Sequence, residues 1–189
     1  MVSLQAVSDA QWNLIYTQNI KDLRKPIQPK EPKACPGNLM SLIQDNPDFS
    51  IFNYMIGVGQ LYNKFNSPQA NFTIFVPTDS FLRAKYSENM FKNMDLYTAR
   101  ETVLYHTLRG KVTFDMLRSS KCMYLDTMID KSVYSKILVE GRDNTVVLNN
   151  TARMKAKDIQ LTNGMIHIIT DLLIPPVFVD NLRPYFVCG

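Results

Sequence analysis

Two histidines, His106 and His167, are the side chains of this sequence best suited to proton transfer near neutral pH. A hydrolytic site built around His106 would also need a nucleophile and a carboxylate that orients the ring, and Asp79 is the candidate for the carboxylate. No local spacing supplies the rest of that set. His106 lies on the apolar face of a predicted helix, and His167 lies within the apolar run 165–169. We therefore expect both histidines to be hydrogen-bonded structural residues, and we expect the chain not to be an enzyme.

The three cysteines, Cys35, Cys122 and Cys188, lie far apart in the sequence. Metal knuckles and dithiol redox motifs place two cysteines about two to four residues apart, so neither motif is present. With only two histidines besides, a zinc site is not expected, and we predict no metal and no cofactor. The cysteines allow three single-bridge pairings with one thiol left over, or no bridge at all. Cys35 and Cys188 flank the compact part of the chain and are one candidate pair, within or between chains.

Length and composition describe an ordinary globular protein. The chain has 189 residues, of which 46% are apolar and 20% charged, which suits one domain with tails or two small ones. The formal net charge of +4 is mild and the charges are scattered, which argues against a nucleic-acid partner. No run approaches the roughly 18 apolar residues of a membrane-spanning helix. The first residues show no basic leader followed by an apolar stretch, so we expect no signal peptide in this chain.

The N-terminal region differs from the rest of the sequence. A capping box precedes a predicted amphipathic helix over residues 9–23, and residues 26–36 hold four prolines and form a predicted extended linker. The basic residues of this region are Lys21, Arg24, Lys25, Lys30 and Lys33. Because acidic residues dilute them, we favour a solvated segment over a site for acidic glycans or membrane surfaces.

In the compact part, predicted helices come first and predicted strands later. Helices are predicted over residues 39–44 and 49–63, from Thr78 or Asp79 onward, and from Asp95 to about His106; strands are predicted over 72–76, 135–140, 145–148, 153–159 and 165–169. The dipeptide Asn163-Gly164 between the last two strands is a strong hairpin signal. This order indicates an α+β fold rather than an alternating α/β fold. The expected organisation is an N-terminal helix and linker (1–36), a compact domain (37–177) and a C-terminal tail (178–189).

Three blocks of the compact part resemble the fasciclin-like adhesion domain. Residues 71–81 are similar to the family's strand–Pro-Thr-Asp–helix box, residues 104–111 to its Tyr-His box, and residues 162–176 to its closing hairpin box. The boxes occur in the family's order and at its usual separations, and the resemblance covers about residues 38–176. It implies a fasciclin-like β-wedge of short, mostly antiparallel strands with a flanking helical layer. It also implies extracellular adhesion, with integrins and matrix proteins as partners and no established enzymatic chemistry.

The resemblance points to two candidate partner-binding sites. The family's Tyr-His box is linked to integrin binding, which gives that role to Tyr105 and His106; the alternative is that both are core residues. Asp158 and Ile159 stand at the spacing of the family's Asp-Ile integrin-recognition motif, where a carboxylate would meet the integrin's metal ion, a hard cation that takes oxygen ligands. The alternative there is a carboxylate that bonds a turn beside a core isoleucine. Strand alternation groups Asp158 with apolar side chains unless the strand ends or bulges at that point.

Two N-glycosylation sequons begin at Asn71 and Asn149. About two are expected by chance in a chain of this composition, so they do not demonstrate secretion. We expect Asn149, at a predicted strand end, to be the more accessible. Together these observations predict a non-enzymatic glycoprotein domain, secreted or associated with the cell surface, that recognises an integrin or an extracellular-matrix protein. The alternative is a scaffolding domain that uses its N-terminal helix and linker to form homo-oligomers without binding a receptor.

Overall fold

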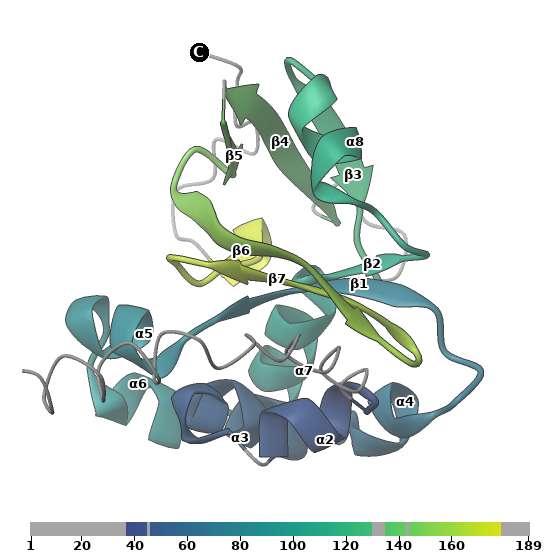
Figure 1. The fold of residues 1–189 in the computed structure, drawn as a ribbon. Helices are drawn as coiled ribbons and strands as arrows, with labels where there is room; N and C mark the ends of the chain where they lie inside the picture. Colours follow the sequence, from purple (N-terminus) through teal and green to yellow (C-terminus); the bar gives the residue numbers. More distant parts are fainter. Residues whose placement is uncertain (1–36, 45, 130–134, 143, 179–189) are drawn as a thin grey trace, which may run out of the picture. The chain divides into compact units, whose positions relative to one another are not determined.

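The computed structural model describes residues 37–44, 46–129, 135–142 and 144–178, all within the unit Cys35–Gly189. Figure 1 shows their helices and strands. The predicted helix over residues 9–23, the proline-containing linker and all but the first residue of the predicted tail lie outside these ranges. Everything below concerns the described residues.

The first half of the described chain is mostly helical. Its elements are α2 (Leu39–Gln44), η1 (Pro47–Phe49), α3 (Ser50–Val58), α4 (Tyr62–Asn66), α5 (Asp79–Lys85), α6 (Glu88–Lys92) and α7 (Leu96–Tyr105), with α8 (Phe114–Ser119) and η2 (Pro176–Phe178) farther along. The bounds of α2 confirm the helix predicted over residues 39–44. Asp95 caps α7 as predicted, because its side chain accepts a hydrogen bond from the Thr98 amide at 2.8 Å.

The single helix predicted over residues 49–63 is wrong, because the chain forms α3 and α4 instead. Gln60 between them has a φ of 55°, in the left-handed region that ends a helix. Just before it, Gly59 lies against α7 so closely that a Cβ atom there would stand 2.9 Å from the Arg100 Cα. The end of α3 is thus set by its packing on a helix much later in the sequence.

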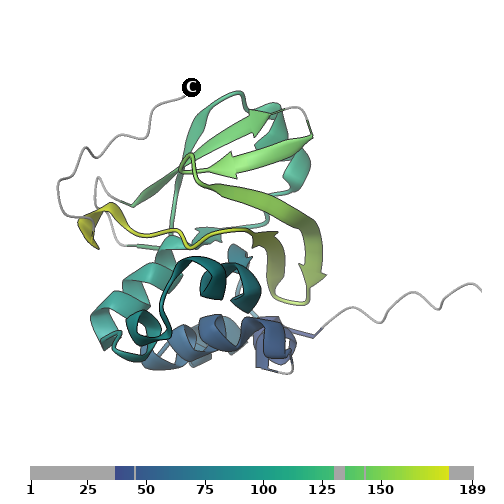
Figure 2. The same cartoon turned by 90° about the vertical axis from the view of Figure 1, so that its left-hand side faces the viewer.

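Seven strands form one sheet in the order β2-β1-β7-β6-β5-β4-β3. They are β1 (Phe72–Pro77), β2 (Thr107–Arg109), β3 (Met123–Asp126), β4 (Lys136–Arg142), β5 (Thr145–Leu148), β6 (Ala152–Leu161) and β7 (Gly164–Ile169). Every pairing is antiparallel except that of β1 with β7. Figures 1 and 2 show β6 connecting the β1–β2–β7 region to the β3–β4–β5 region. Helices segregated from a mostly antiparallel sheet confirm the predicted α+β class.

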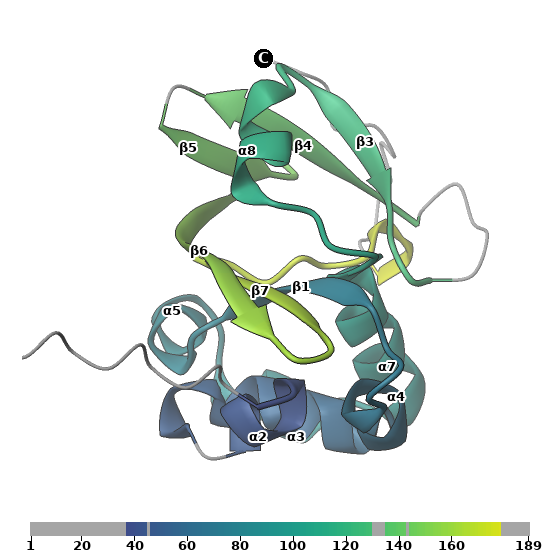
Figure 3. The same ribbon diagram turned by 45° about the vertical axis from the view of Figure 1, so that its right-hand side comes forward.

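Strand β1 is the central strand that the sequence predicts, buried along its whole length between β2 and β7. Its side chains serve two separate hydrophobic clusters. Ile74 and Val76 pack with the helices α2, α3 and α7, whereas Phe75 packs with residues of β4, β5 and α8. Figure 3 shows β1 and β7 next to the helical layer and α8 beside the other strands. Burial on both faces explains why this run lacks polar alternation.

The predicted hairpin joins β6 and β7 through Thr162 and Asn163. Asn163 is only 1% exposed. Its Nδ2 donates to the Phe65 carbonyl at 2.7 Å, and its Oδ1 accepts from the Leu39 amide at 3.2 Å. The turn side chain therefore fastens the hairpin to α2 and α4.

Candidate functional site

Tyr105 lies at the end of α7, and none of its surface is exposed. Its hydroxyl donates to the Lys136 carbonyl of β4 at 2.8 Å and accepts from Asn149 Nδ2 at 3.0 Å. Burial raises the pKa of Tyr105 to about 12. Tyr105 therefore ties α7 to the β4–β5 pair.

His106 follows Tyr105 and is also completely buried. Its Nδ1 lies 2.7 Å from the Thr102 carbonyl oxygen, and its Nε2 lies 2.9 Å from the Leu173 backbone nitrogen. A carbonyl only accepts and an amide N–H only donates, so Nδ1 carries the proton and the ring is neutral. Burial lowers the pKa of His106 to about 4, outweighing the opposing effects of the Thr102 carbonyl and the Asp171 carboxylate. The ring packs edge-on against Phe52, with centroids 5.4 Å apart.

The environment of Tyr105 and His106 is that of core residues, so a partner cannot touch either side chain unless the domain opens. The hydrolase alternative also lacks its carboxylate. Asp79 accepts hydrogen bonds from the Ser50 hydroxyl and the Ile51 amide, which fixes it to the start of α3 instead. Both ring nitrogens of His106 are occupied by backbone groups, which leaves neither for proton transfer.

Asp158 lies at an irregularity of β6. The pairing of β6 with β7 shifts register between Met154 and Ala156, and again between Ala156 and Ile159. The backbone of Asp158 has a φ of 55°, a left-handed conformation that Asp tolerates better than most residues. Strand alternation groups Asp158 with apolar side chains unless the strand ends or bulges at that point. The structure contains a bulge there, which frees Asp158 from the alternation.

Three hydrogen bonds hold this bulge in place. Asp158 Oδ1 accepts from the Phe114 amide at the start of α8 at 2.8 Å, and the Asp158 amide donates to His167 Nδ1 at 3.1 Å. His167 Nε2 donates to the Val112 carbonyl at 2.8 Å, so this ring is neutral as well, and burial lowers its pKa. The imidazole thus joins the bulge to the segment that precedes α8.

Asp158 and Ile159 are both half-buried. Ile159 packs against the hydrophobic cluster of the helical layer. Asp158 Oδ1 is occupied by the Phe114 amide, whereas no described residue donates a hydrogen bond to Oδ2. Among the described residues, the carboxylate is therefore held by one oxygen only.

The two sequons differ in accessibility. Asn71 is exposed directly before β1. Asn149 is only 3% exposed, because its Oδ1 accepts from the Leu138 amide at 2.9 Å and its Nδ2 donates to Tyr105. The prediction that Asn149 is the more accessible sequon is wrong: its side chain fills a buried polar position between β4 and α7. A glycan on its Nδ2 would have to displace the bond to Tyr105.

Cys122 is disulfide-bonded, while Cys35 and Cys188 lie outside the described residues. An intrachain bridge from Cys122 would use Cys35 or Cys188 and would therefore compete with the Cys35–Cys188 pairing. Among the described residues, no cluster of three or more His, Cys, Asp or Glu side chains is placed to hold a metal ion. The described helices also include none long and apolar enough to cross a membrane.

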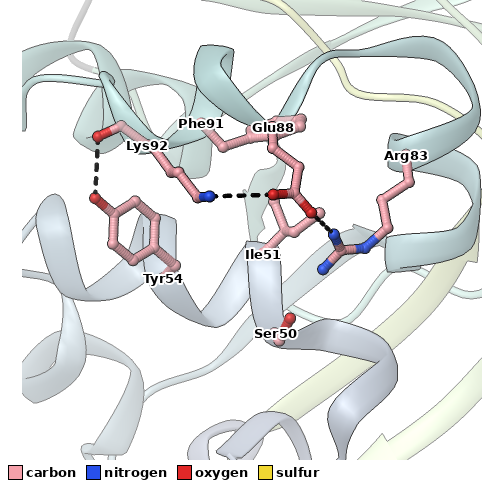
Figure 4. A pocket seen from close by; sticks show the side chains of 7 residues that line it. All are labelled: Ser50, Ile51, Tyr54, Arg83, Glu88, Phe91 and Lys92. Atoms are coloured by element: carbon pink, nitrogen blue, oxygen red, sulfur yellow. Dashed lines mark hydrogen bonds and ion pairs between the residues drawn. The ribbon is translucent and has the colours of Figure 1, made fainter.

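A pocket that the sequence analysis did not predict opens between α3, α5 and α6 (Figure 4). Its volume is about 340 Å³, and its lining residues are Ser50, Ile51, Tyr54, Arg83, Glu88, Phe91 and Lys92. The Glu88 carboxylate forms ion pairs with Lys92 and Arg83, and the hydrogen bond from Lys92 contributes most to lowering the pKa of Glu88. Two cations and one carboxylate line the pocket, and Glu88 pairs with both cations, so the lining keeps one net positive charge but holds no free carboxylate. Helix α6 was not predicted, which is why the pocket was missed.

Comparison with known proteins supports the fasciclin-like fold. The Fasciclin domain family matches residues 47–175. Human periostin is 27% identical over 154 residues, which cover 79% of this chain and 18% of periostin. Among solved structures, a FAS1 domain pair from the insect cell adhesion molecule fasciclin I matches with a TM-score of 0.63 and 18% identity, over 75% of this chain and 52% of the pair. The chain thus spans a small part of periostin and about half of the insect domain pair, and the expected fasciclin-like fold is confirmed.

Proposed function

Because this chain belongs to the fasciclin domain family, we propose that it is a non-enzymatic, extracellular cell-adhesion domain that recognises an integrin or an extracellular-matrix protein. The fold that it shares with a domain pair of an insect cell adhesion molecule supports the adhesion role. The observation that carries the proposal is the β6 bulge, which presents a half-exposed carboxylate and a half-exposed isoleucine side by side.

In the proposed mechanism, Asp158 offers its Oδ2 to the metal ion of an integrin. Hard divalent cations prefer carboxylate oxygens, and Oδ2 accepts no hydrogen bond from a described residue. Ile159 adds a small apolar contact beside it. The bonds to Phe114 and His167 hold the pair in one conformation before binding, which lowers the entropic cost of recognition.

Tyr105 and His106 enter this proposal as residues that hold the surface rather than as residues that touch the partner. Tyr105 fixes α7 to β4, and His106 fixes the end of α7 to the segment that follows β7. Since both are completely buried, substitutions there would weaken adhesion by destabilising the domain.

An extracellular location has two further supports. A disulfide at Cys122 is expected in oxidising compartments and is rare in the cytosol. Asn71 is an exposed sequon asparagine, and we propose it as the glycosylated residue of this domain.

Self-association is a second candidate function, supported by a different part of the surface. Leu96, Tyr97 and Val177 are exposed by 45%, 58% and 48%, and the Tyr97 ring packs edge-on against Phe178 at 5.9 Å. This contact joins the start of α7 to η2, and contiguous exposed apolar side chains mark interaction surfaces. Sedimentation velocity at increasing protein concentration, with the parent and a Tyr97→Ser variant, tests this alternative.

Cell attachment to surfaces coated with the protein tests the adhesion proposal. Asp158→Asn is the informative variant, because Asn keeps an oxygen for the Phe114 amide and tolerates a positive φ but removes the negative charge. Asp126→Ala is the matched control, since Asp126 is an exposed aspartate on β3. We expect attachment to fall at least about tenfold with Asp158→Asn, which corresponds to about 1.4 kcal/mol, and to be unchanged with Asp126→Ala. Equal attachment by parent and Asp158→Asn, with equal melting temperatures, would remove Asp158 from the site.

A further inference from the structure

Exposed cations gather around the β6 bulge without carboxylate partners. Several cations elsewhere in the described residues form ion pairs: Arg83 and Lys92 with Glu88, Lys85 with Asp171, Arg118 with Asp115, Lys136 with Asp126, and Arg142 with Glu140. By contrast, Lys111, Arg153, Lys155 and Lys157 are all exposed, and the structure gives none of them an ion pair with another described residue. These four residues are called the basic surface below.

The contacts of His167 bring the two segments of the basic surface together. One imidazole ring bonds the Val112 carbonyl at 2.8 Å and the Asp158 amide at 3.1 Å. Lys111 directly precedes Val112, and Lys157 directly precedes Asp158, so the backbones of both lysines lie near this ring. The Lys157 ammonium also lies 3.6 Å from the centroid of the Phe114 ring, which places it over the start of α8. The positive charges of two segments distant in sequence therefore share one region of the surface.

The nearest carboxylates along these segments do not cancel this charge. Asp115 is engaged by Arg118 at 3.4 Å. Asp158 directs one oxygen to the Phe114 amide, and it is a single negative charge among four positive ones. Four positive charges and one negative charge leave a local excess of positive charge, which favours binding of a polyanion over a single small anion.

The shape of the basic surface favours a linear polyanion. Along β6 the cations occupy alternate positions, and alternate residues of a strand are about 6.6 Å apart. Because β6 shifts register within this stretch, Arg153 and Lys157 are at most about 13 Å apart along the strand, with Lys155 between them. A row of that kind fits a chain that repeats its negative charges along its length.

The side chains around the basic surface indicate which polyanion. Single-stranded nucleic acids are held by exposed aromatic rings between the cations, but Phe114, the aromatic residue here, is only 5% exposed. Membrane-bound basic surfaces gain much of their affinity from apolar side chains that insert into the lipid. The residues between these cations, Met154 and Ala156, face the interior instead.

We propose that the basic surface binds a sulfated polysaccharide chain, with Lys155 and Lys157 as its main contacts and Lys111 and Arg153 extending it. An extracellular domain meets such chains in the matrix and at cell surfaces, so the biological setting rests on the function proposed above, whereas the binding itself does not. Each lysine is expected to contribute about fivefold to the affinity, as lysines do at other anionic surfaces. Binding of this kind weakens steeply as the salt concentration rises.

Binding of the full chain to immobilised heparin at about 0.15 M salt tests the proposal. The informative variant is Lys155→Gln with Lys157→Gln, and the matched control is Lys64→Gln with Lys121→Gln, which removes the same charge from two exposed lysines elsewhere. We expect the first pair to weaken binding about 25-fold, from about fivefold for each lysine, and the control pair to leave it within about twofold. Lys157→Arg, which keeps the charge over Phe114, should bind like the parent. Desulfated heparin should bind much more weakly than heparin.

Several results would overturn the proposal. One is equal loss of binding in the informative and control variants, which would indicate a response to net charge alone. Another is loss of binding only on neutralising Lys25, Lys30 and Lys33, which would place the site in the N-terminal segment. A third is binding to vesicles containing phosphatidylserine without binding to heparin, which would indicate a membrane partner. Because no cell or receptor takes part, none of these results depends on whether Asp158 binds an integrin.

Discussion

Lowering the pH from about 7.5 to about 5 should destabilise the domain, because His106 has to remain neutral in its folded position. Burial lowers the pKa of His106 from 6.5 to about 4. Between these values the unfolded chain binds a proton that the folded domain does not bind. His106 therefore makes its full contribution to the free energy of unfolding above pH 6.5, and this contribution decreases as the pH falls toward about 4.

The magnitude follows from the same pKa difference. Each pH unit in this window costs about 1.4 kcal/mol per group. The change from pH 6.5 to pH 5 covers about one and a half pH units, so His106 alone should lower the free energy of unfolding by about 2 kcal/mol. The pKa of His167 is also lowered by burial, so this second histidine acts in the same direction.

Urea unfolding at the two pH values measures this effect. The parent protein should lose about 2 kcal/mol or slightly more between pH 7.5 and pH 5. A His106→Gln variant should be less stable at pH 7.5, and its remaining pH dependence should be much smaller. Equal free energies of unfolding at both pH values would refute the reasoning. If His106→Gln kept the full pH dependence of the parent, that dependence would come from other titratable groups.

Four further outcomes are expected. Tyr105→Phe should cost about 1–3 kcal/mol in urea unfolding, because it leaves the buried Asn149 amide without its acceptor; a smaller cost would mean that water replaces the hydroxyl. Asn163→Ala should cost at least about 2 kcal/mol, since it removes the bonds that join the β6–β7 hairpin to the helical layer; unchanged stability would show that the turn holds without them. Residues 38–176, which lack both Cys35 and Cys188, should melt cooperatively by themselves; a broad transition would mean that the removed segments or the Cys122 bridge complete the core. Alkylation and mass spectrometry without reductant should find one free thiol per monomer, because Cys122 is bonded and the total is three; finding none would require a bridge between chains.

The parts of the fold that the sequence predicts well are those with a strong local signal. The apolar run of β1, the Asp95 cap of α7 and the Asn163-Gly164 turn each carry such a signal, and each is present in the structure. The elements that were missed are short or depend on distant partners. Helices α6 and α8 and strands β2 and β3 have only three to six residues each, too few to show a period.

In the candidate site, too, the features with a local sequence signal were predicted and the distant contacts were not. The spacing of the motif predicted Asp158 and Ile159, and a bulge was one of the geometries considered for them. The partners of Asp158 could not be predicted, because the Phe114 amide lies 44 residues away in the sequence. Asn149 was misjudged for a related reason: a strand end is usually exposed, but this one is covered by Tyr105 from another part of the chain. A sequence pattern identifies the residues of a site but not the distant groups that form hydrogen bonds with them.

Binding of purified integrin ectodomains to the immobilised domain is the most direct test of the adhesion account. The binding should be measured for several integrins with manganese or magnesium present and again with EDTA. We expect at least one integrin to bind saturably with the cation, to be released by EDTA, and to bind Asp158→Asn at least about tenfold more weakly. Binding that persists in EDTA and is unaffected by Asp158→Asn would contradict the proposed mechanism, and the absence of binding to every integrin tested would contradict an integrin partner altogether.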